Sequence, residues 1–274
     1  MKKLIMGMAA LALLFTSCEK DQPENVNDLA QESVDMSDFY LHTDFNDEDG
    51  KAAQNAKNCY SMKNLNRLLK EDDKLYKKMY VIEQNTRSIL TKQAVTAQGK
   101  PGSGGGGTTP APTDNLGVIS IPVVVTVVYS NTQENISDAQ INSQIAVMNA
   151  DFRGPAATDG IVVGPNYFGN TGYVSAPFDK GRTVTHEVGH YLNLRHIWGD
   201  GACRQDDFVA DTPSSNGPNY GCPSYPTVNC RTNDMTMNYM DYTNDACMYM
   251  FSTGQKSRLR TVFASSGPRA AMAN

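Results

Sequence analysis

The sequence predicts an α+β protein, and three observations support this fold class. Dense Val and Ile across residues 118–129 indicate a buried strand. Apolar residues recur at helical spacing within residues 57–97 and 137–148, which indicates helices. Four cysteines fall between residues 203 and 247, where no long apolar pattern exists, and this indicates an irregular, disulfide-bonded region.

The chain begins with a predicted export signal. Residues 1–17 contain two lysines, an apolar run that is too short to span a bilayer, and small residues before Cys18. The stretch Leu14–Cys18 resembles a bacterial lipobox, in which Cys18 becomes the lipidated first residue of the mature protein; a plain secretory signal is the alternative. Both interpretations predict export, and the first places the protein on the outer membrane or cell surface through a lipid anchor.

Composition divides the remaining chain into four parts. Residues 18–56 are acidic and polar, which predicts a flexible, lipid-anchored tether. Residues 57–98 carry apolar side chains at roughly helical spacing, so one or two helices are expected there. Residues 99–114 are rich in Gly, Pro and Thr and predict a linker. Residues 115–274 are then the C-terminal domain.

Within this domain, a helix is expected after Ser137, because Ser137 and Gln140 have the spacing of a capping box. Ile141, Ile145 and Met148 would form the apolar stripe of that helix.

Two further elements are expected in the domain. Residues 161–163 are a short strand candidate, since three apolar β-branched residues follow one another there. Residues 252–263 predict a last helix, capped by Ser252 with Gln255 three residues later.

The most informative motif is the stretch from His186 to His196. If residues 180–193 form a helix, His186 and His190 project from one face and can share one metal ion. Glu187 would act as a general base on water acidified by zinc. The alternative is an amphipathic helix whose histidines are ordinary core or surface residues.

A helix cannot bring His196 to the same ion, so the chain must turn sharply. Asn193 stands where a left-handed backbone is needed, and after Gly it is the residue that tolerates this conformation best. The sequence therefore predicts a zinc site formed by His186, His190 and His196.

The charge of the chain bears on its possible partners. The net charge is −5 and no strongly basic cluster is present, so nucleic acid is not an expected partner.

Four cysteines lie close together in a segment that is expected to be exported: Cys203, Cys222, Cys230 and Cys247. They predict two disulfides, and the sequence leaves three pairings open. A second zinc site is the rival interpretation, but no C-x-x-C pair supports it.

Blocks of sequence around the zinc motif resemble the pappalysin-type metzincin metallopeptidases. They include residues 121–129, 135–140 and 149–153 before the motif, and Asp211-Thr212-Pro213 and Asn238–Tyr242 after it. The resemblance implies a metzincin-like catalytic domain in residues 115–274, with a twisted mixed sheet, a backing helix, a zinc-site helix and a disulfide-bonded C-terminal subdomain. It also implies a zinc endopeptidase that acts on protein or peptide substrates.

Several residue roles follow from the resemblance. Met240 would be the Met-turn residue beneath the zinc, and Tyr242 would stabilise the developing oxyanion, with a simple packing aromatic as the alternative. The family's disulfide pattern would pair Cys203 with Cys230 and Cys222 with Cys247. Structural calcium is implied near the Asp-Thr-Pro block, and the candidate ligands are Asp206, Asp207, Asp211 and Thr212.

The same resemblance implies a regulatory role for Cys59. Similar enzymes are kept latent by a cysteine thiolate at the open zinc position, and residues 57–98 would be that pro-segment. An unpaired cysteine without a role is the alternative. Cutting the 99–114 linker would then activate the enzyme and release it from the membrane.

The sequence departs from the family in length. Residues 154–185 alone separate Arg153 from His186, so the domain is expected to be shortened by several strands, including the edge strand that would pair with an extended substrate. The alternative function is therefore a catalytically impaired, zinc-binding surface lipoprotein that acts by binding a partner.

Overall fold

The computed structural model describes residues 34–41, 61–97, 116–117, 119, 123–152 and 161–272. The predicted signal at 1–17, the lipidation site Cys18, the latency residue Cys59 and the 99–114 linker all lie outside these ranges. None of the helices in the described part combines the length and apolar character needed to cross a bilayer.

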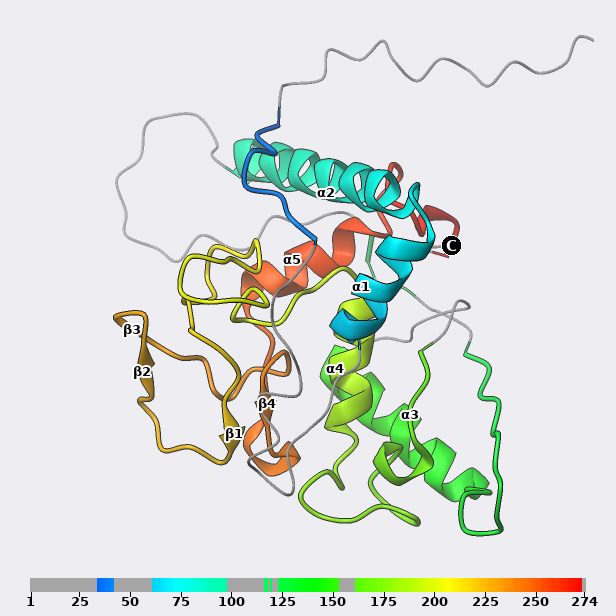
Figure 1. Cartoon of the computed structure of the whole chain (residues 1–274). Helices are drawn as coiled ribbons and strands as arrows, with labels where there is room; N and C mark the ends of the chain where they lie inside the picture. Colours follow the sequence, from blue (N-terminus) through cyan, green and yellow to red (C-terminus); the bar gives the residue numbers. More distant parts are fainter. Residues whose placement is uncertain are drawn as a thin grey trace, which may run out of the picture. The chain divides into compact units, whose positions relative to one another are not determined.

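Five α-helices form the frame of the described residues (Figure 1). They are α1 (Ser61–Glu71), α2 (Leu75–Ala97), α3 (Asp138–Phe152), α4 (Arg182–Tyr191) and α5 (Thr253–Thr261). Single 3₁₀ turns occur at η1 (Pro165–Tyr167), η2 (Asp245–Cys247) and η3 (Ala270–Met272). Helix α3 packs on α4, and α2 packs on α5. This arrangement places α4 between α3 and the C-terminal part of the chain (Figure 1).

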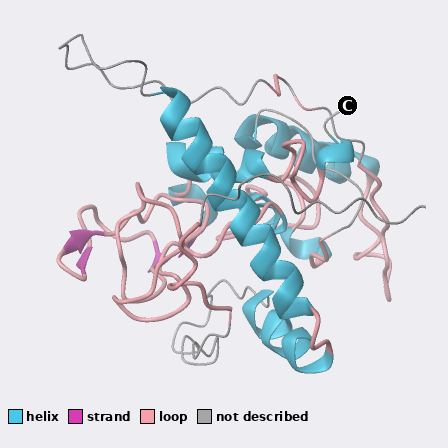
Figure 2. Ribbon diagram, turned by 90° about the horizontal axis from the view of Figure 1, so that it is seen from above, coloured by secondary structure: helices cyan, strands magenta, loops and turns pink. Residues whose placement is uncertain are grey.

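The strands of the described residues are short and form two small sheets. In the first, β1 (Tyr220–Gly221) runs parallel to β4 (Tyr242–Thr243); in the second, β2 (Val228–Asn229) runs antiparallel to β3 (Thr232–Asn233). An isolated parallel bridge joins Asn238 to Met250. Figure 2 shows these strands within the loop-rich part of the molecule. The fold is α+β as expected, but the described residues form no extended twisted sheet.

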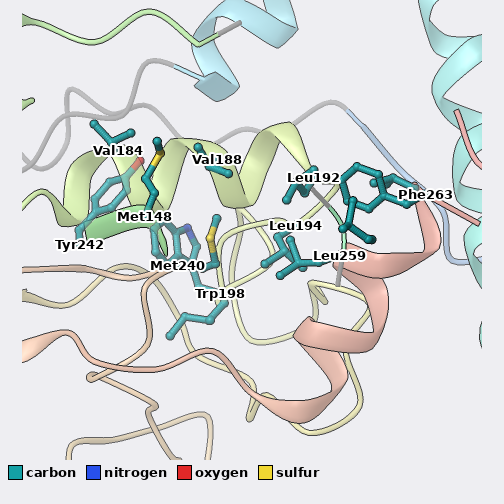
Figure 3. Packing of buried hydrophobic residues seen from close by; sticks show 13 residues of the cluster. Met148, Val184, Val188, Leu192, Leu194, Trp198, Met240, Tyr242, Leu259 and Phe263 are labelled. Atoms are coloured by element: carbon teal, nitrogen blue, oxygen red, sulfur yellow. The ribbon is translucent and has the colours of Figure 1, made fainter. Parts of the chain in front are cut away.

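The buried core gathers along one side of α4. In Figure 3, Val184, Val188 and Leu192 follow one another along the helix, with Tyr242 near its start and Phe263 near its end. The cluster consists of Ile119, Met148, Val184, Val188, Leu192, Leu194, Ile197, Trp198, Met240, Tyr242, Leu259, Val262 and Phe263. Burial of this apolar surface fixes α4 and the segment that follows it.

The expected strand at 118–129 is not a strand in its described part. Residues 123–129 have no ladder partners, and Val124 and Val128 are each 85% exposed. The strand expected at 161–163 is likewise wrong, since Val162 is 99% exposed while Ile161 and Val163 pack against the core. A strand requires neighbours along the sheet, which local β propensity alone cannot supply.

Two glutamines of α3 bind the backbone of the loop at residues 165–169. Gln140 Nε2 donates to the carbonyls of Pro165 (2.9 Å) and Phe168 (2.8 Å), and Gln144 Oε1 accepts from the Gly169 amide (2.6 Å). The predicted capping box is therefore half formed: Ser137 Oγ accepts from the Gln140 amide (3.2 Å), while the Gln140 side chain binds the loop.

The N-terminal segments meet the expectation in part. Helices α1 and α2 occupy residues 61–97, as the apolar spacing predicts. Residues 34–41 lie within the stretch expected to be a flexible tether, yet they pack on the rest of the molecule: Leu41 is buried, and Phe39 contacts the rings of Tyr80 and Phe208.

Candidate metal centre

Helix α4 begins at a turn fixed by two buried groups. Gly181 has φ +74°, and a Cβ there would approach the side chain of Gln144 to 2.9 Å. Asp245 Oδ2 accepts hydrogen bonds from the amides of Lys180 (2.9 Å) and Arg182 (3.1 Å). A carboxylate at this end of a helix satisfies amides that have no partner within the helix and complements the helix dipole.

The other end of α4 forms a Schellman motif. The amide of Leu194 donates to the Gly189 carbonyl (2.9 Å), and the amide of Asn193 donates to the His190 carbonyl (3.0 Å). Asn193 has φ +71°, the left-handed conformation that the sequence predicts for this position. This turn reverses the chain so that residues 194–196 return beside the helix.

The turn brings the three histidines together. His190 Nε2 lies 3.2 Å from His186 Nε2 and 3.0 Å from His196 Nε2. These nitrogens form a cluster with the spacing of metal ligands among the described residues. Three imidazoles at 2.0–2.1 Å from a tetrahedral zinc ion would have nitrogens about 3.3 Å apart, so the arrangement fits that ion.

Each ring's second nitrogen is already engaged. Nδ1 of His186 lies 2.7 Å from the Tyr239 carbonyl, and Nδ1 of His190 lies 3.0 Å from the Leu194 carbonyl. Nδ1 of His196 pairs with Asp200 Oδ1. Because these partners are acceptors, each Nδ1 carries a proton, and the three facing Nε2 atoms present lone pairs. Three converging lone pairs repel one another unless a cation lies between them, which is the chemical reason that the cluster suits a metal.

Asp200 is a site residue that the sequence analysis missed. It is fully buried beside His196. Burial opposes its ionisation, but His196, Arg195 and His190 together outweigh that effect and lower the pKa of Asp200. The spacing of four residues after His196 is the only signal in the sequence, and it does not distinguish Asp200 from other nearby acids.

Buried residues pack around the histidines and their helix: Met240 and Tyr242 from the segment around β4, and Trp198 from the loop after His196. A Cβ at Gly189 would collide with Sδ of Met240, so the helix approaches this methionine as closely as a glycine allows. Tyr242 is 2% exposed, and its ring centre lies 5.0 Å from that of His196 and 5.7 Å from that of His186. Trp198 stacks on His196 at 4.3 Å with an interplanar angle of 5°.

Glu187 lies on α4 directly after the first histidine and is half-buried. The group of possible metal ligands found among the described residues consists of the three histidines and does not include Glu187.

The predicted calcium ligands take part in separate local hydrogen bonds. Asp207 is buried and both its oxygens accept from Thr212 Oγ1 at 2.8 Å. Asp211 accepts from Ser252 Oγ (2.6 Å) and the Gly254 amide (2.8 Å) at the start of α5, while exposed Asp206 accepts from the Phe208 amide (2.6 Å). Within the described residues, the metal-ligand cluster found is the histidine triad, and these acids do not form a second one.

Two disulfides hold the loops that follow the site. Cys203 is joined to Cys230 and Cys222 to Cys247, with Cα atoms 5.4 and 5.7 Å apart. This is the pairing that the resemblance implies. The second bridge joins Cys222, directly after β1, to Cys247 in the η2 turn. The same turn contains Asp245, whose carboxylate accepts from an amide at the start of α4.

The chain matches one protein family and several extracellular metalloproteases. Residues 130–264 match the Peptidase_M43 family, described as Pregnancy-associated plasma protein-A. "Extracellular metalloprotease 1" of Coccidioides posadasii is 42% identical over 92 residues, which are 32% of each chain. An "Extracellular metalloprotease" of Arthroderma benhamiae is 41% identical over 112 residues, or 38% of this chain and 36% of that one. The chain thus spans about a third of the length of these relatives.

Solved structures match over a larger share. Mature mirolysin of Tannerella forsythia in complex with a cleaved peptide is 35% identical with a TM-score of 0.53; the match covers 57% of this chain and 95% of that one. A promirolysin mutant is 31% identical with a TM-score of 0.54 and is matched over 69% of this chain and 91% of its own.

Proposed function

Because the chain belongs to the pappalysin family of metallopeptidases, we propose that it is an exported, zinc-dependent endopeptidase that hydrolyses peptide bonds of protein substrates. The observation that carries the proposal is the convergence of three Nε2 lone pairs whose Nδ1 atoms are all engaged. His186, His190 and His196 would hold the ion. When bound, zinc would acidify a water molecule and polarise the scissile carbonyl.

The protein residues then have distinct roles in the reaction. Glu187 takes a proton from the attacking water and later delivers it to the leaving amine. Tyr242 donates its hydroxyl hydrogen to the oxygen that becomes negative in the tetrahedral intermediate. The placement of Tyr242 against the rings of His186 and His196 supports this role.

Glu187→Gln tests the mechanism. We expect kcat/KM on casein or a peptide library to fall about 10²–10⁴-fold, because the general base is lost. Zinc content should stay at the wild-type level. The matched control is Glu134→Gln, which alters an exposed carboxylate that accepts from Ser130. Equal cleavage by wild type and Glu187→Gln would refute the role of Glu187, and stoichiometric zinc without any cleavage by the wild type would refute the peptidase.

Tyr242→Phe tests the second role. It keeps the buried ring against the two histidines and removes only the hydroxyl. We expect kcat to fall about 10²-fold with little change in KM, since the lost bond acts in the transition state.

We further propose that the enzyme is made latent and anchored, with Cys59 as the thiolate on the zinc and Cys18 as the lipidated residue. Support comes from the order of the parts expected from the sequence, with a predicted export signal and the 57–98 segment ahead of the metal site, and from the match to a promirolysin form. Cys59→Ser should be active without proteolysis, and Cys18→Ala should leave the membrane fraction.

Calcium binding at Asp206, Asp207, Asp211 and Thr212 stays a prediction. The contact of Thr212 with both oxygens of buried Asp207 supports it, because a hard cation could coordinate the same carboxylate and hydroxyl oxygens. Calcium titration followed by thermal unfolding is the measurement, and an unchanged Tm at millimolar calcium would contradict it.

A further inference from the structure

The hydrogen-bond partners behind the three histidines differ in charge. His186 and His190 donate from Nδ1 to backbone carbonyls at 2.7 Å and 3.0 Å, and both of these acceptors are neutral. Of the three, only His196 donates to a side-chain carboxylate, that of Asp200. A hydrogen bond to a charged acceptor is roughly twice as strong as one between neutral groups. Asp200 is therefore the strongest of the three supports behind the site.

His196 depends on such support more than the other two histidines do. Helix α4 fixes the backbone of His186 and His190, whereas His196 lies in the loop that follows the helix. Two contacts restrict its ring. Trp198 stacks on the face of the ring at 4.3 Å with an interplanar angle of 5°, and Asp200 binds the ring at Nδ1. Together they set both the plane of the imidazole and its rotation within that plane.

The backbone after His196 is bent so that the Asp200 carboxylate returns to the ring. The Gly199 amide donates to the His196 carbonyl (2.9 Å), and this bond closes a tight turn. Gly199 and Asp200 follow one another in the left-handed region, at φ +64° and φ +62°. A left-handed aspartate costs backbone free energy, and such residues persist where the surrounding structure requires them, often at functional sites. The contact with His196 is the requirement that this backbone meets.

The Asp200 carboxylate is fully buried and only partly paired. Its exposed fraction is 0%, and Oδ2 accepts no hydrogen bond from the described residues. A buried carboxylate that is incompletely paired is costly unless a positive charge lies nearby. Three neutral imidazoles leave the charge of a divalent ion uncompensated, so the ion and Asp200 would stabilise each other.

We propose that Asp200 is a positioning residue for the third zinc ligand, and that its negative charge strengthens the binding of the ion. It holds the His196 ring in the orientation in which Nε2 faces His190 Nε2, 3.0 Å away. A carboxylate behind a histidine ligand also makes the imidazole a better electron donor to the metal. This inference rests on the proposed function in one respect, that the histidine cluster binds zinc, and it does not depend on which bonds the protein cleaves.

Asp200→Asn in the full chain tests the role of the charge. Asparagine keeps the shape of the side chain and one acceptor oxygen, so the substitution removes mainly the charge. We expect zinc binding in chelator competition to weaken about ten- to hundredfold, and the visible absorption of Co²⁺ bound in place of zinc to shift. The matched control is Asp138→Asn, an exposed carboxylate at the first residue of α3, and it should leave both readouts unchanged.

Two outcomes of this experiment would overturn the proposal. One is a zinc affinity of Asp200→Asn equal to that of the Asp138→Asn control. The other is a lower Tm of the zinc-free Asp200→Asn protein together with an unchanged Co²⁺ spectrum, since that combination indicates a role in folding alone.

Proton NMR of the zinc-loaded wild type keeps the test valid if Asp200→Asn does not fold. We expect the Nδ1 proton of His196 to resonate further downfield than those of His186 and His190, because a carboxylate polarises the N–H bond more than a carbonyl does. The stacked Trp198 ring identifies the His196 signals through cross-relaxation. A His196 signal at the same position as the other two would overturn the charged hydrogen bond.

These readouts separate the role of Asp200 from the proposed function, because none of them uses a peptide substrate. A wild type that binds zinc but cleaves nothing would refute the peptidase and leave the role of Asp200 intact. An active wild type whose zinc affinity is unchanged by Asp200→Asn would refute the role of Asp200 alone. A wild type that binds no zinc would refute both.

Discussion

Asp207 shows how one buried side chain links stability to pH. It is almost fully buried and accepts from Thr212 Oγ1 and the Val209 amide. Burial outweighs these hydrogen bonds and raises the pKa of Asp207 from 3.8 to about 8. A carboxyl whose folded pKa lies above its unfolded pKa binds its proton more tightly in the folded state. The contribution of the Asp207 proton to the free energy of unfolding is therefore complete below pH 3.8, and it declines as the pH rises to about 8.

Asp207→Asn should remove this pH dependence. An amide can accept from the Val209 amide and donate to Thr212, and it does not ionise. We expect the wild type, in calcium-free buffer, to lose up to about 1.4 kcal/mol of unfolding free energy per pH unit within this window relative to the variant. Urea unfolding of both proteins at pH 5, 6.5 and 8 measures the difference, and parallel pH profiles would contradict the prediction.

Among the elements, α4 illustrates how a helix end determines a metal site. Its first turn is held by Asp245, and its last turn closes through the Schellman bonds around Asn193. The helix positions two ligands by its own periodicity, while the turn directs the third. Glu83 and Arg258, 175 residues apart in sequence, pair beside this turn, and Arg258 Nε donates to the Asn193 carbonyl (2.8 Å). The geometry of the turn therefore depends on a local motif and on contacts from distant segments of the chain.

Asn193 substitutions should separate backbone strain from side-chain contact. Asn193→Ala removes the short polar side chain that makes φ +71° tolerable and should cost about 1–2 kcal/mol of unfolding free energy, with weaker zinc binding. Both variants lose the bond to Thr86, but only Asn193→Gly relieves the backbone strain. The glycine variant should therefore be more stable than the alanine variant. Urea unfolding and zinc titration compare the two, and an alanine variant as stable as the glycine variant would contradict the strain argument.

At the scale of the whole molecule, apolar residues with high β propensity are exposed on the described part of the chain. Val124 and Val128 are each 85% exposed, and Val162 is 99% exposed. An unpaired, β-prone segment of this kind is a template for pairing with another chain. Its side chains contribute little to the core, which depends instead on α4, α5 and the disulfide-bonded loops.

We therefore expect concentration-dependent self-association through residues 123–129. Val124→Lys should reduce it, because a charge on the exposed segment opposes pairing between chains. Thr126→Lys adds the same charge at a nearby position but removes no apolar side chain, so it should reduce self-association less than Val124→Lys does. Sedimentation velocity over a tenfold concentration range measures the effect. A wild type that stays monomeric throughout would refute the expectation.

Local patterns in the sequence are enough to predict the histidine cluster and the turn that closes it. The spacing of His186 and His190 requires only a helix, and the need for a left-handed residue at Asn193 follows from the position of His196. The capping box of Ser252 and Gln255 also forms as its spacing predicts. These features depend on residues a few positions apart, so propensity and backbone sterics are sufficient to predict them.

The hydrogen-bond partners of the histidines and the pairing of distant segments depend on tertiary contacts. The Nδ1 acceptors come from Tyr239, Leu194 and Asp200, and the Glu83–Arg258 pair joins opposite ends of the chain. The strand expected within 118–129 was wrong in its described part, although its composition is typical of a strand. A ladder, a buried ion pair and a hydrogen bond to a distant carbonyl each require a partner whose position is set by packing of the whole chain, and no local pattern contains that information.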